Sequence, residues 1–391
     1  MPTTNPIVIL AAARTPMGAF QGAFAPLAAH DLGGVAIRAA VARAGVDPAR
    51  VDQVVFGNCL MAGQGQAPAR QAAFKGGLPQ STGAVTLSKM CGSGLFAAML
   101  AHDMLVAGSH DLIVAGGMES MTNAPHLLPK ARSGIRIGHG QVLDHMLLDG
   151  LEDAYEPGRS MGSFGEDCAA KYGFTRAAQD AFATASAQRA QAAIQSGAFA
   201  AEIAPVLAKG VEINTDEAPG KIRLDKIPTL KPAFQTDGTI TAASSSSISD
   251  GAAALVLARA STAAQMGVQP LARIVGHATF AQAPGWFATA PLGAVQKLLA
   301  KTGWGVADVD LWEINEAFAV VPMALMAELD LPHSRVNVHG GACALGHPIG
   351  ASGARILVTL LYALRAQGMR RGVATLCIGG GEATALAVEL L

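Results

Sequence analysis

The chain has 391 residues, of which 51% are hydrophobic and 15% charged, and its formal net charge is −1. This length exceeds one ordinary hydrophobic core, so we expect two or three domains or lobes. The balanced charge excludes the strongly basic surface that is typical of nucleic-acid-binding proteins. The five cysteines are odd in number and form no CxxC pair, which argues against a disulfide framework and favours a reducing compartment.

Two segments bear on the location of the protein. Met1 to Pro6 lead directly into an apolar run, without the charged region, apolar core and cleavage site of a signal peptide. The apolar stretch from Ile356 to Leu364 lies between two arginines and is too short to span a bilayer. We therefore expect a cytoplasmic protein that binds neither membranes nor nucleic acids.

Short apolar runs alternate with helical periodicity along most of the chain. This alternation predicts an α/β fold with a substantial parallel sheet. Strands are predicted at Ile7–Leu10, Val51–Phe56, Asp111–Ala115, Ala253–Ala258, Leu271–Ala278, Val309–Ile314 and Val373–Ile378. Helices are predicted at Asp31–Ala44, Gln66–Lys75, Leu95–Ala107, Ala177–Ser196, Gly293–Lys301, Glu316–Leu329 and Ser352–Gln367.

The middle of the chain has a different pattern. From about Glu119 to Ser249, proline-containing loops surround one long predicted helix near residues 177–196. This region ends in the serine run from Ser244 to Ser247, which could be a disordered linker or a binding loop. Because the run is only four residues long and leads directly into an apolar strand, we favour a binding loop.

A sequence unit occurs twice. Cys91-Gly-Ser-Gly precedes a predicted helix and then a strand that ends near Gly116-Gly117. His347-Pro-Ile-Gly likewise precedes a helix and then a strand that ends near Gly379-Gly380. The repetition predicts a duplicated unit in which each copy supplies one active-site element. The alternative is coincidence, since turn, helix and strand follow one another in any α/β protein.

Cys91 is the first candidate for a catalytic residue. It precedes Gly92, Ser93 and Gly94, which lead into a predicted helix. The free N–H groups and the dipole of a helix N-terminus favour a thiolate, which is the form of cysteine that attacks acyl groups. The alternative is a small buried core cysteine, but the glycine-rich turn favours a nucleophile.

His347 and Asn315 lie at other junctions of strand and helix. Pro348 keeps His347 out of the helix, so its imidazole could deprotonate Cys91 or donate to a thioester oxygen. From its own surroundings, a helix-capping role for His347 is an equal alternative. The Asn315 amide could position a water or donate to an oxyanion, and it could also cap the following helix.

Cys377 ends a predicted strand and precedes three glycines. A buried, inert thiol is one interpretation. Paired with Cys91, it becomes an acid or base that takes a proton from the α-carbon of a thioester. Because such carbon acids are weak, the enolate also needs hydrogen-bond donors, and the backbone N–H groups of Cys91 and Gly379 are candidates.

Two other chemistries find little support in the sequence. Cys343 and His347 are four residues apart but have no matching second pair of ligands, so we expect no metal site. No Gly-x-Gly-x-x-Gly motif follows the first predicted strand, which argues against a nicotinamide cofactor.

Several motifs in this order along the chain resemble those of the thiolase family. The resemblance extends from Arg14-Thr15-Pro16 to the last predicted strand. The motifs are Cys91-Gly-Ser-Gly, Gly116-Gly-Met-Glu-Ser-Met121, Asn315-Glu-Ala-Phe318, Asn337-Val-His-Gly-Gly-Ala342, Gly346-His-Pro-Ile-Gly350 and Cys377-Ile-Gly-Gly-Gly381.

The resemblance implies a five-layer α-β-α-β-α fold built from two duplicated βαβαβαββ halves, with a loop domain inserted in the first. It places the N-terminal half in residues 1–119 and 246–271, and the C-terminal half in residues 272–391. Residues 120–245 would form the loop domain that binds coenzyme A. Homotetramers built from dimers are implied as well.

The resemblance also implies an activity, the reversible Claisen condensation of two acetyl-CoA to acetoacetyl-CoA and free coenzyme A, without a cofactor. Cys91 would carry the acyl group, and Cys377 would move the proton at carbon. His347 would activate Cys91 and line one oxyanion hole together with a water bound by Asn315. The N–H groups of Cys91 and Gly379 would form the second oxyanion hole.

Further residues fall on family positions that contact the substrate. Ser246 matches the serine that contacts pantetheine, and Phe287 lies where short-chain enzymes place a Met or Phe beside the acyl pocket. The positions that line the substrate are matched by Leu151, Met161, Ala242 and Phe318. Ser160-Met161-Gly162 replaces the usual His-Met-Gly of the family, so the coenzyme A contacts depart in detail from the family pattern.

Three alternative functions remain open at this point. A 3-ketoacyl-CoA thiolase of fatty-acid degradation would share these motifs and accept longer chains. A decarboxylating ketoacyl synthase of the same fold would use a second His or Asn in place of Cys377. A catalytically silent acyl-CoA carrier would bind without turnover, which the presence of all three reactive side chains argues against.

Overall fold

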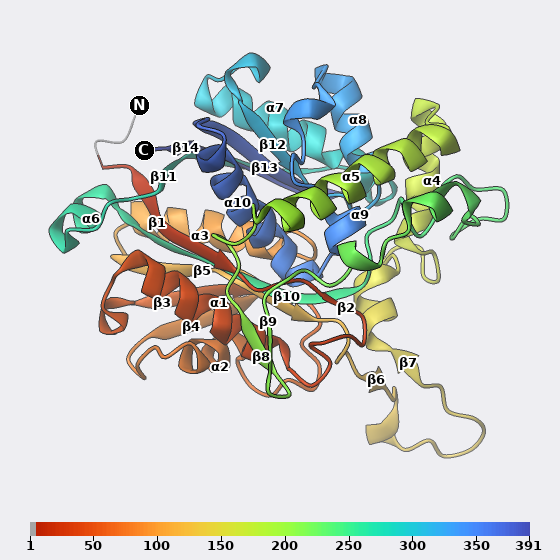
Figure 1. The fold of residues 1–391 in the computed structure, drawn as a ribbon. Helices are drawn as coiled ribbons and strands as arrows, with labels where there is room; N and C mark the ends of the chain where they lie inside the picture. Colours follow the sequence, from red (N-terminus) through yellow and green to blue (C-terminus); the bar gives the residue numbers. More distant parts are fainter. Residues whose placement is uncertain (1–4) are drawn as a thin grey trace.

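The computed structural model describes residues 5–391, and a ten-stranded sheet forms its centre (Figure 1). The strands follow the order β12-β13-β14-β11-β1-β10-β5-β3-β4, with β2 beside β10. Only two residue pairs join β1 to β11, Val8 with Arg273 and Ile9 with Ala272. This seam divides the sheet into an N-terminal and a C-terminal half, and the strand order of one half repeats that of the other.

The N-terminal half contains strands that are buried along their whole length. Every residue of β1 and β5 is buried, because both faces of the sheet are covered. The elements of this half are β1 (Ile7–Arg14), β2 (Gly18–Ala19), α1 (Ala29–Ala44), β3 (Gln53–Gly57), α2 (Pro68–Lys75), β4 (Gly83–Leu87), α3 (Ser93–Val106), β5 (Leu112–Ser120), β10 (Ser249–Arg259) and α6 (Ala260–Met266).

Within the described residues, the C-terminal half repeats this arrangement without equivalents of β2 and β4. In place of a partner like β4, β12 has only an isolated bridge between Trp312 and Val336. The elements of this half are β11 (Ala272–Ala281), α7 (Ala290–Thr302), β12 (Leu311–Ile314), α8 (Val320–Leu329), α9 (Ala342–Leu345), α10 (Ile349–Ala366), β13 (Arg371–Ile378) and β14 (Glu382–Leu390).

Three hydrophobic clusters give the molecule its layers. The first joins α3 and α10 to the inner faces of both half-sheets. The second packs α1 and α2 on the outer face of the N-terminal half, and the third packs α7 and α8 on the outer face of the C-terminal half. Helices and half-sheets therefore alternate in five layers, with α3 against α10 in the middle (Figure 1).

Helix α10 is mostly apolar and buried on nearly all sides because it lies between the two half-sheets. It is the one helix in the described part of the chain that is long and apolar enough to cross a membrane, with a mean hydropathy of 1.3. In the structure 83% of this stretch is buried inside the protein. Its composition is thus that of a central core helix.

The predicted strands and helices are present, but the parallel sheet is smaller than expected. Parallel pairing is confined to β3 with β4, β3 with β5, and β12 with β13. The other pairs are antiparallel, including β13 with β14. Only Gly379, Gly380 and Gly381 connect these two strands, and so short a link cannot make the crossover that parallel strands need.

The segment between β5 and β10 lies outside the main sheet. It contains the two-stranded pairs β6 (His126–Leu127) with β7 (Leu143–Asp144) and β8 (Val206–Ala208) with β9 (Val211–Ile213). Two helices, α4 (Met161–Tyr172) and α5 (Arg176–Ser196), complete it. The β6–β7 segment projects from the body of the molecule, whereas α5 packs against α9 (Figure 1).

The serine run at the end of this segment is ordered by hydrogen bonds. Ser244 Oγ accepts the N–H of Thr241 at 2.9 Å, and Ser245 Oγ donates to the Thr241 carbonyl at 2.8 Å. The Ser246 N–H donates to the Ala317 carbonyl at 3.0 Å. The run is therefore an ordered loop held against the C-terminal half, and the linker interpretation is wrong.

Candidate functional site

Cys91 lies on a sharp turn between β4 and α3. Met90 adopts a φ of +46°, a left-handed conformation that a non-glycine residue rarely takes. Ser93 Oγ accepts the N–H of Lys89 at 2.7 Å and donates to the Met90 carbonyl at 2.7 Å. These two bonds stabilise the turn and fix the position of Cys91 at the start of the helix.

The turn brings Cys91 against the end of β13. A Cβ atom on Gly92 would collide with the side chain of Ile378, so glycine allows this approach without a shift of Ile378. The backbone N–H groups of Gly379 and of Cys91 itself lie close enough to the Cys91 sulfur to lower its pKa. Cys377, which is fully buried, is close enough for Cys91 to raise its pKa further. The structure therefore brings Cys91, Cys377 and Gly379 together.

Burial governs the protonation of both thiols. It raises the pKa of Cys91 to about 11, although the N–H groups of Gly379 and Cys91 act in the opposite direction. Burial also holds the pKa of Cys377 well above its usual range. The N–H groups therefore favour a Cys91 thiolate, as expected, but in the free protein the cost of burying the charge is larger.

His347 lies on a second turn, directly before α10. Gly346 has a φ of +96° there, and a Cβ atom on it would collide with Ser249. The backbone N–H of His347 donates to the Ser247 carbonyl at 3.0 Å. The imidazole is nearly buried, and burial together with the charge of Arg355 lowers its pKa to about 3. The side chain is thus a neutral imidazole at physiological pH.

The hydrogen bonds of Ser352 define which nitrogen of His347 carries the proton. Ser352 Oγ donates to the Pro348 carbonyl at 3.0 Å, and it lies 2.5 Å from His347 Nδ1. Because the hydroxyl proton is committed to the carbonyl, Nδ1–H is the donor to Ser352 Oγ. This leaves Nε2 with a free lone pair, and the Asn315 amide nitrogen lies 3.5 Å from it. Nε2 is therefore able to accept a proton.

Asn315 follows β12 and is fixed to the neighbouring strand. Its N–H donates to the Thr375 carbonyl at 3.0 Å, and its side-chain Oδ1 is buried without a partner within residues 5–391. Helix α8 begins only at Val320, so the prediction of a helix from Glu316, capped by Asn315, is wrong. The chain between β12 and α8 is irregular, and within it Phe318 forms a bridge with Ser245.

Sequence reasoning did not assign a role to Glu119, although it lies in one of the motifs. This carboxylate at the end of β5 is fully buried. Its Oε1 accepts from Asn58 Nδ2 at 2.6 Å and from the Leu60 N–H at 3.1 Å. Its Oε2 accepts the N–H groups of Cys59 and Gly350, both at 2.9 Å. Glu119 thus ties the loop after β3 to the start of α10.

Glu316 has a similar role in the other half. It is buried, and it accepts hydrogen bonds from Ser186 Oγ at 2.7 Å and from Asn337 Nδ2 at 2.8 Å. The Cys343 N–H donates to it at 3.1 Å. Glu316 therefore fixes the segment that leads to His347. An acidic residue within an otherwise apolar strand or strand end was the signal that could have identified both carboxylates.

The predicted substrate-lining residues fall on two sides of the thiols. Leu151 packs with Cys91 against one small apolar cluster. Met161 lies beside Gly379, since a Cβ atom on that glycine would be 3.5 Å from the Met161 methyl group. Phe287 and Phe318 belong to the cluster that contains Cys377, with their ring centres 6.4 Å apart. The residues near the two thiols are thus mostly apolar.

A cavity of about 320 Å³ opens next to the His347 turn. Its wall includes Ala242 and Ser247 from the loop that contains the serine run, which we call the serine loop. Cys343 from α9 and the basic residues Arg223 and Lys226 also line it. Ser246 is half-buried beside this wall but does not line it. The Ser247 carbonyl also accepts the backbone N–H of His347. The same loop therefore lines the cavity and holds the turn that carries the imidazole.

This geometry suits acyl transfer through a thiol. A half-buried thiol on a strained turn lies beside two backbone N–H donors, and a second thiol is buried close to it. An imidazole with a free Nε2 lies at the start of α10, whose first residue, Ile349, packs in the same cluster as Cys91. These groups can carry an acyl group on a cysteine sulfur, stabilise an oxyanion and transfer protons.

Comparison with known proteins defines the class. The family model of the thiolase N-terminal domain matches residues 7–261, and that of the thiolase C-terminal domain matches residues 268–390. The chain therefore belongs to the thiolase family.

Full-length relatives support this placement. An acetyl-CoA acetyltransferase of Cupriavidus necator is 48% identical over 389 residues, which cover 98% of this chain and 99% of the relative. Acetyl-CoA acetyltransferase 1 of Arabidopsis thaliana is 48% identical over 392 residues, which cover 98% of this chain and 94% of the relative.

Solved structures have the same fold. The acetyl-CoA acetyltransferase of Bacillus anthracis matches with a TM-score of 0.96 and 40% identity, over 99% of each chain. A thiolase from Ascaris suum in complex with coenzyme A matches with a TM-score of 0.94 and 41% identity, over 99% of this chain and 100% of that one. The predicted thiolase-like fold is confirmed.

Proposed function

We propose that the protein is an acetyl-CoA C-acetyltransferase, which condenses two acetyl-CoA reversibly to acetoacetyl-CoA and free coenzyme A. The full-length relatives that carry this name support the proposal. The observation that carries it is the meeting of Cys91, Cys377 and the Gly379 N–H, because the reaction needs an acyl carrier, a base for carbon and an oxyanion donor together.

In the first half-reaction, Cys91 attacks the carbonyl carbon of acetyl-CoA. The free Nε2 of His347 takes the thiol proton and returns it to the sulfur of the leaving coenzyme A. The carbonyl oxygen becomes negatively charged as the carbon–sulfur bond forms, and the N–H groups of Cys91 and Gly379 stabilise it. The products are acetyl-Cys91 and free coenzyme A.

In the second half-reaction, Cys377 passes its proton to His347 Nε2, and the resulting thiolate removes a proton from the methyl group of a second acetyl-CoA. The thioester oxygen of the resulting enolate is stabilised by protonated His347 Nε2 and by a water held by Asn315, whose Oδ1 is a buried, unpaired acceptor in the described chain. The enolate carbon attacks the acetyl-Cys91 carbonyl, and the Cys91 thiolate leaves and takes back the proton from His347 Nε2. Thiolysis follows the same steps in reverse.

Coenzyme A would occupy the cavity beside the His347 turn. Residues 120–245, the proposed loop domain between the half-domains 1–119 with 246–271 and 272–391, supply most of its wall. Arg223 and Lys226 offer positive charge for the phosphates. Ala242 and Ser246 would contact the pantetheine arm from the serine loop, which leads from the cavity toward His347.

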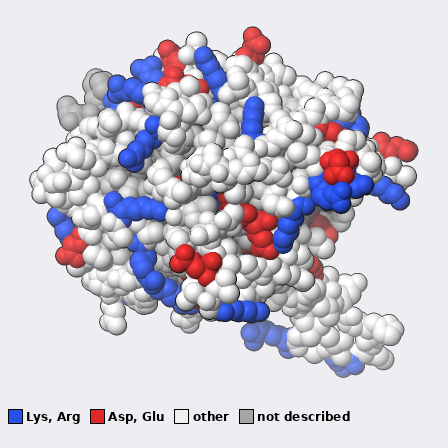
Figure 2. All heavy atoms as spheres, viewed as in Figure 1, with Lys and Arg blue, Asp and Glu red and all other residues white. Residues whose placement is uncertain are grey.

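We also infer a homotetramer built from dimers. Strand β4 is an edge of the sheet, and its Val85 is exposed, so it can pair with a second copy. The projecting β6–β7 segment exposes Ile137 by 95% and Val142 by 65%. Figure 2 shows basic side chains on this projection and mixed charges elsewhere on this face. Burial of these apolar side chains against other subunits would remove them from water.

The reaction moves an acyl group and protons, and it changes no oxidation state. We therefore propose that coenzyme A thioesters are the only small molecules that the chemistry requires, without a cofactor. The five cysteines are free thiols, which suits a cytoplasmic location because thiols remain reduced there.

The test is thiolysis of acetoacetyl-CoA and of a longer 3-ketoacyl-CoA with free coenzyme A. The reaction is monitored as the loss of the enolate absorbance of the 3-ketoacyl-CoA. The proposal predicts fast cleavage of acetoacetyl-CoA and slow cleavage of the longer substrate. Comparable cleavage of both would instead indicate a broader 3-ketoacyl-CoA thiolase. Absence of cleavage of either substrate would overturn the assignment as a thiolase enzyme.

A further inference from the structure

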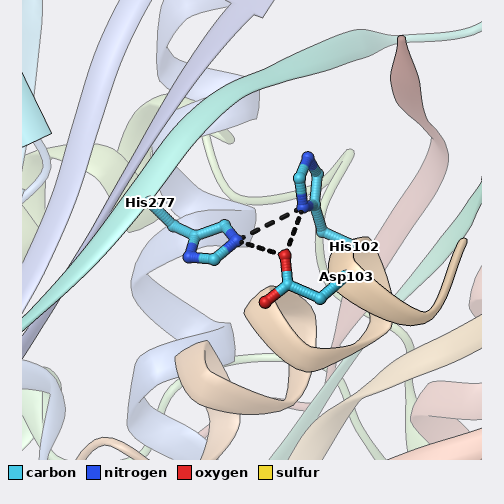
Figure 3. Close-up of side chains that lie close together, drawn as sticks. All are labelled: His102, Asp103 and His277. Carbon is cyan, nitrogen blue, oxygen red and sulfur yellow. Dashed lines mark hydrogen bonds and ion pairs between the residues drawn. The ribbon is translucent and has the colours of Figure 1, made fainter. Parts of the chain in front are cut away.

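Three side chains that commonly bind metals meet at the junction of the two halves. His102 and Asp103 lie near the C-terminal end of α3, and His277 lies within β11. Figure 3 shows the two imidazoles and the carboxylate pointing toward one another. None of the three belongs to the catalytic residues described above, so their arrangement needs a separate explanation.

The three atoms that face one another form a compact triangle. Asp103 Oδ1 lies 2.9 Å from His102 Nδ1 and 2.9 Å from His277 Nε2, and the two nitrogens are 3.2 Å apart (Figure 3). In a tetrahedral zinc site, ligands at about 2.0–2.1 Å from the metal are about 3.3–3.4 Å from each other. Movements of roughly a few tenths of an ångström in these three atoms would convert the triangle into one face of such a site.

The surroundings favour an ion that binds from the solvent side. The His277 side chain is only 10% exposed, whereas that of Asp103 is 59% exposed. The inner ligand is therefore held by β11, and the outer ligand leaves a path for the ion and for water at a fourth position. The cation of Lys301 is near, but it donates to the His277 backbone carbonyl at 3.2 Å, away from the ring nitrogen.

The ligand set selects a class of metal. Imidazole nitrogens bind Zn²⁺, Co²⁺ and Ni²⁺ well, whereas Mg²⁺ and Ca²⁺ prefer sites made only of oxygen. We propose that His102, Asp103 and His277 form a site for a divalent transition-metal ion of the zinc class, outside the catalytic machinery. The ion would link α3, which begins directly after the Cys91 turn, to β11 across the seam between the halves.

Binding is measured by titrating the whole protein with Zn²⁺ in a calorimeter, after iodoacetamide has blocked the half-buried Cys91. One ion per chain and a higher Tm in the presence of Zn²⁺ are expected, because the ion binds only the folded arrangement. Mg²⁺ is expected to give neither effect. Absence of Zn²⁺ binding by the folded protein would overturn the proposal.

Variants assign the ion to these ligands. His277→Gln and Asp103→Asn are each expected to weaken Zn²⁺ binding by about tenfold or more. His110→Gln, a change just beyond the end of α3, is the matched control and should leave binding unchanged. Since Asp103 is exposed, Asp103→Asn tests the site even if His277→Gln lowers stability. Equal Zn²⁺ affinity in Asp103→Asn and the unmodified sequence would contradict the assignment.

Cobalt distinguishes these ligands from thiols. With Co²⁺ in place of Zn²⁺, a site of two nitrogens and one oxygen gives only weak d–d absorbance. A strong thiolate-to-cobalt charge-transfer band in the near ultraviolet would show that cysteines hold the ion and would overturn the proposal.

Discussion

The turn, helix and strand that occur in both halves use the same framework for different chemistry. In the N-terminal copy, Cys91 precedes α3, and the end of β5 provides Glu119. In the C-terminal copy, His347 precedes α10, and the end of β13 provides Cys377. One strand end thus binds backbone loops, whereas the other supplies a reactive thiol. Duplication delivers two equivalent turns to one site, and the residue types then divide the roles.

The copies also differ in burial. Cys91 is half-buried, whereas His347 is 6% exposed and Cys377 is fully buried. The residue that must meet an incoming acyl group is therefore the most accessible, and the residues that exchange protons are shielded. Shielding keeps His347 neutral and Cys377 protonated in the free protein.

The largest expected effect separates the two thiols. Cys91→Ala should lower condensation by a factor on the order of 10⁶, because no other residue can carry the acyl group. Cys377→Ala should also abolish condensation, yet it should still form the acyl-enzyme. Incubation with radiolabelled acetyl-CoA and mass spectrometry of the intact chain measure this difference. Label retained by Cys91→Ala, or normal condensation by Cys377→Ala, would contradict the division of roles.

The next largest effect tests whether Glu119, at the end of β5, positions the catalytic turns. In Glu119→Gln, the amide NH₂ replaces an oxygen that accepts two N–H donors. We expect a loss of about 3 kcal/mol of unfolding free energy and a decrease of about 100-fold in kcat from displacement of the loops.

Two further variants sharpen this test by urea unfolding and steady-state kinetics. Glu316→Gln should have a similar effect, because it removes the matching anchor of the His347 segment. Glu212→Gln, an exposed change on β9, should affect neither stability nor kcat. A Glu119→Gln variant with unchanged kcat would show that the carboxylate does not position the catalytic turns.

The smallest effect concerns pH. Because burial raises the pKa of Cys91 to about 11, the reactive thiolate increases as the pH rises toward that value. The rate of alkylation by iodoacetamide should therefore rise about tenfold per pH unit between about pH 7 and pH 9. A plateau below about pH 8 would show instead that the free enzyme holds a Cys91 thiolate. Cys91→Ala should not be alkylated on the same timescale.

Much of this arrangement follows from local sequence. The apolar strands and the reactive turns were predictable because glycine and proline mark turns, and strands buried on both faces are apolar throughout. The start of α8 was not, because Ser245 and Ser246 pair with Phe318 and Ala317 from more than 70 positions away. Such long-range contacts override the local helical pattern.

The electrostatics of the site was equally inaccessible to sequence. The high pKa of Cys91 arises from its packing beneath β13 and the loops, which the helix-dipole argument does not include. The partners of Glu119 come from residues 58–60 and 350, and no spacing rule relates them. The cluster of His102, Asp103 and His277 spans about 175 positions and had no sequence signature.

Helix α10 has a consequence for the order of synthesis. The inner face of the N-terminal half-sheet packs against residues that begin at Ile349, near the end of the chain. A ribosome that has not passed this point holds a nascent chain with β1, β5 and α3 still partly exposed to water. The first half of the protein therefore depends on the later synthesis of Ile349–Ala366 for its own core, and we expect chaperones to hold it during that interval.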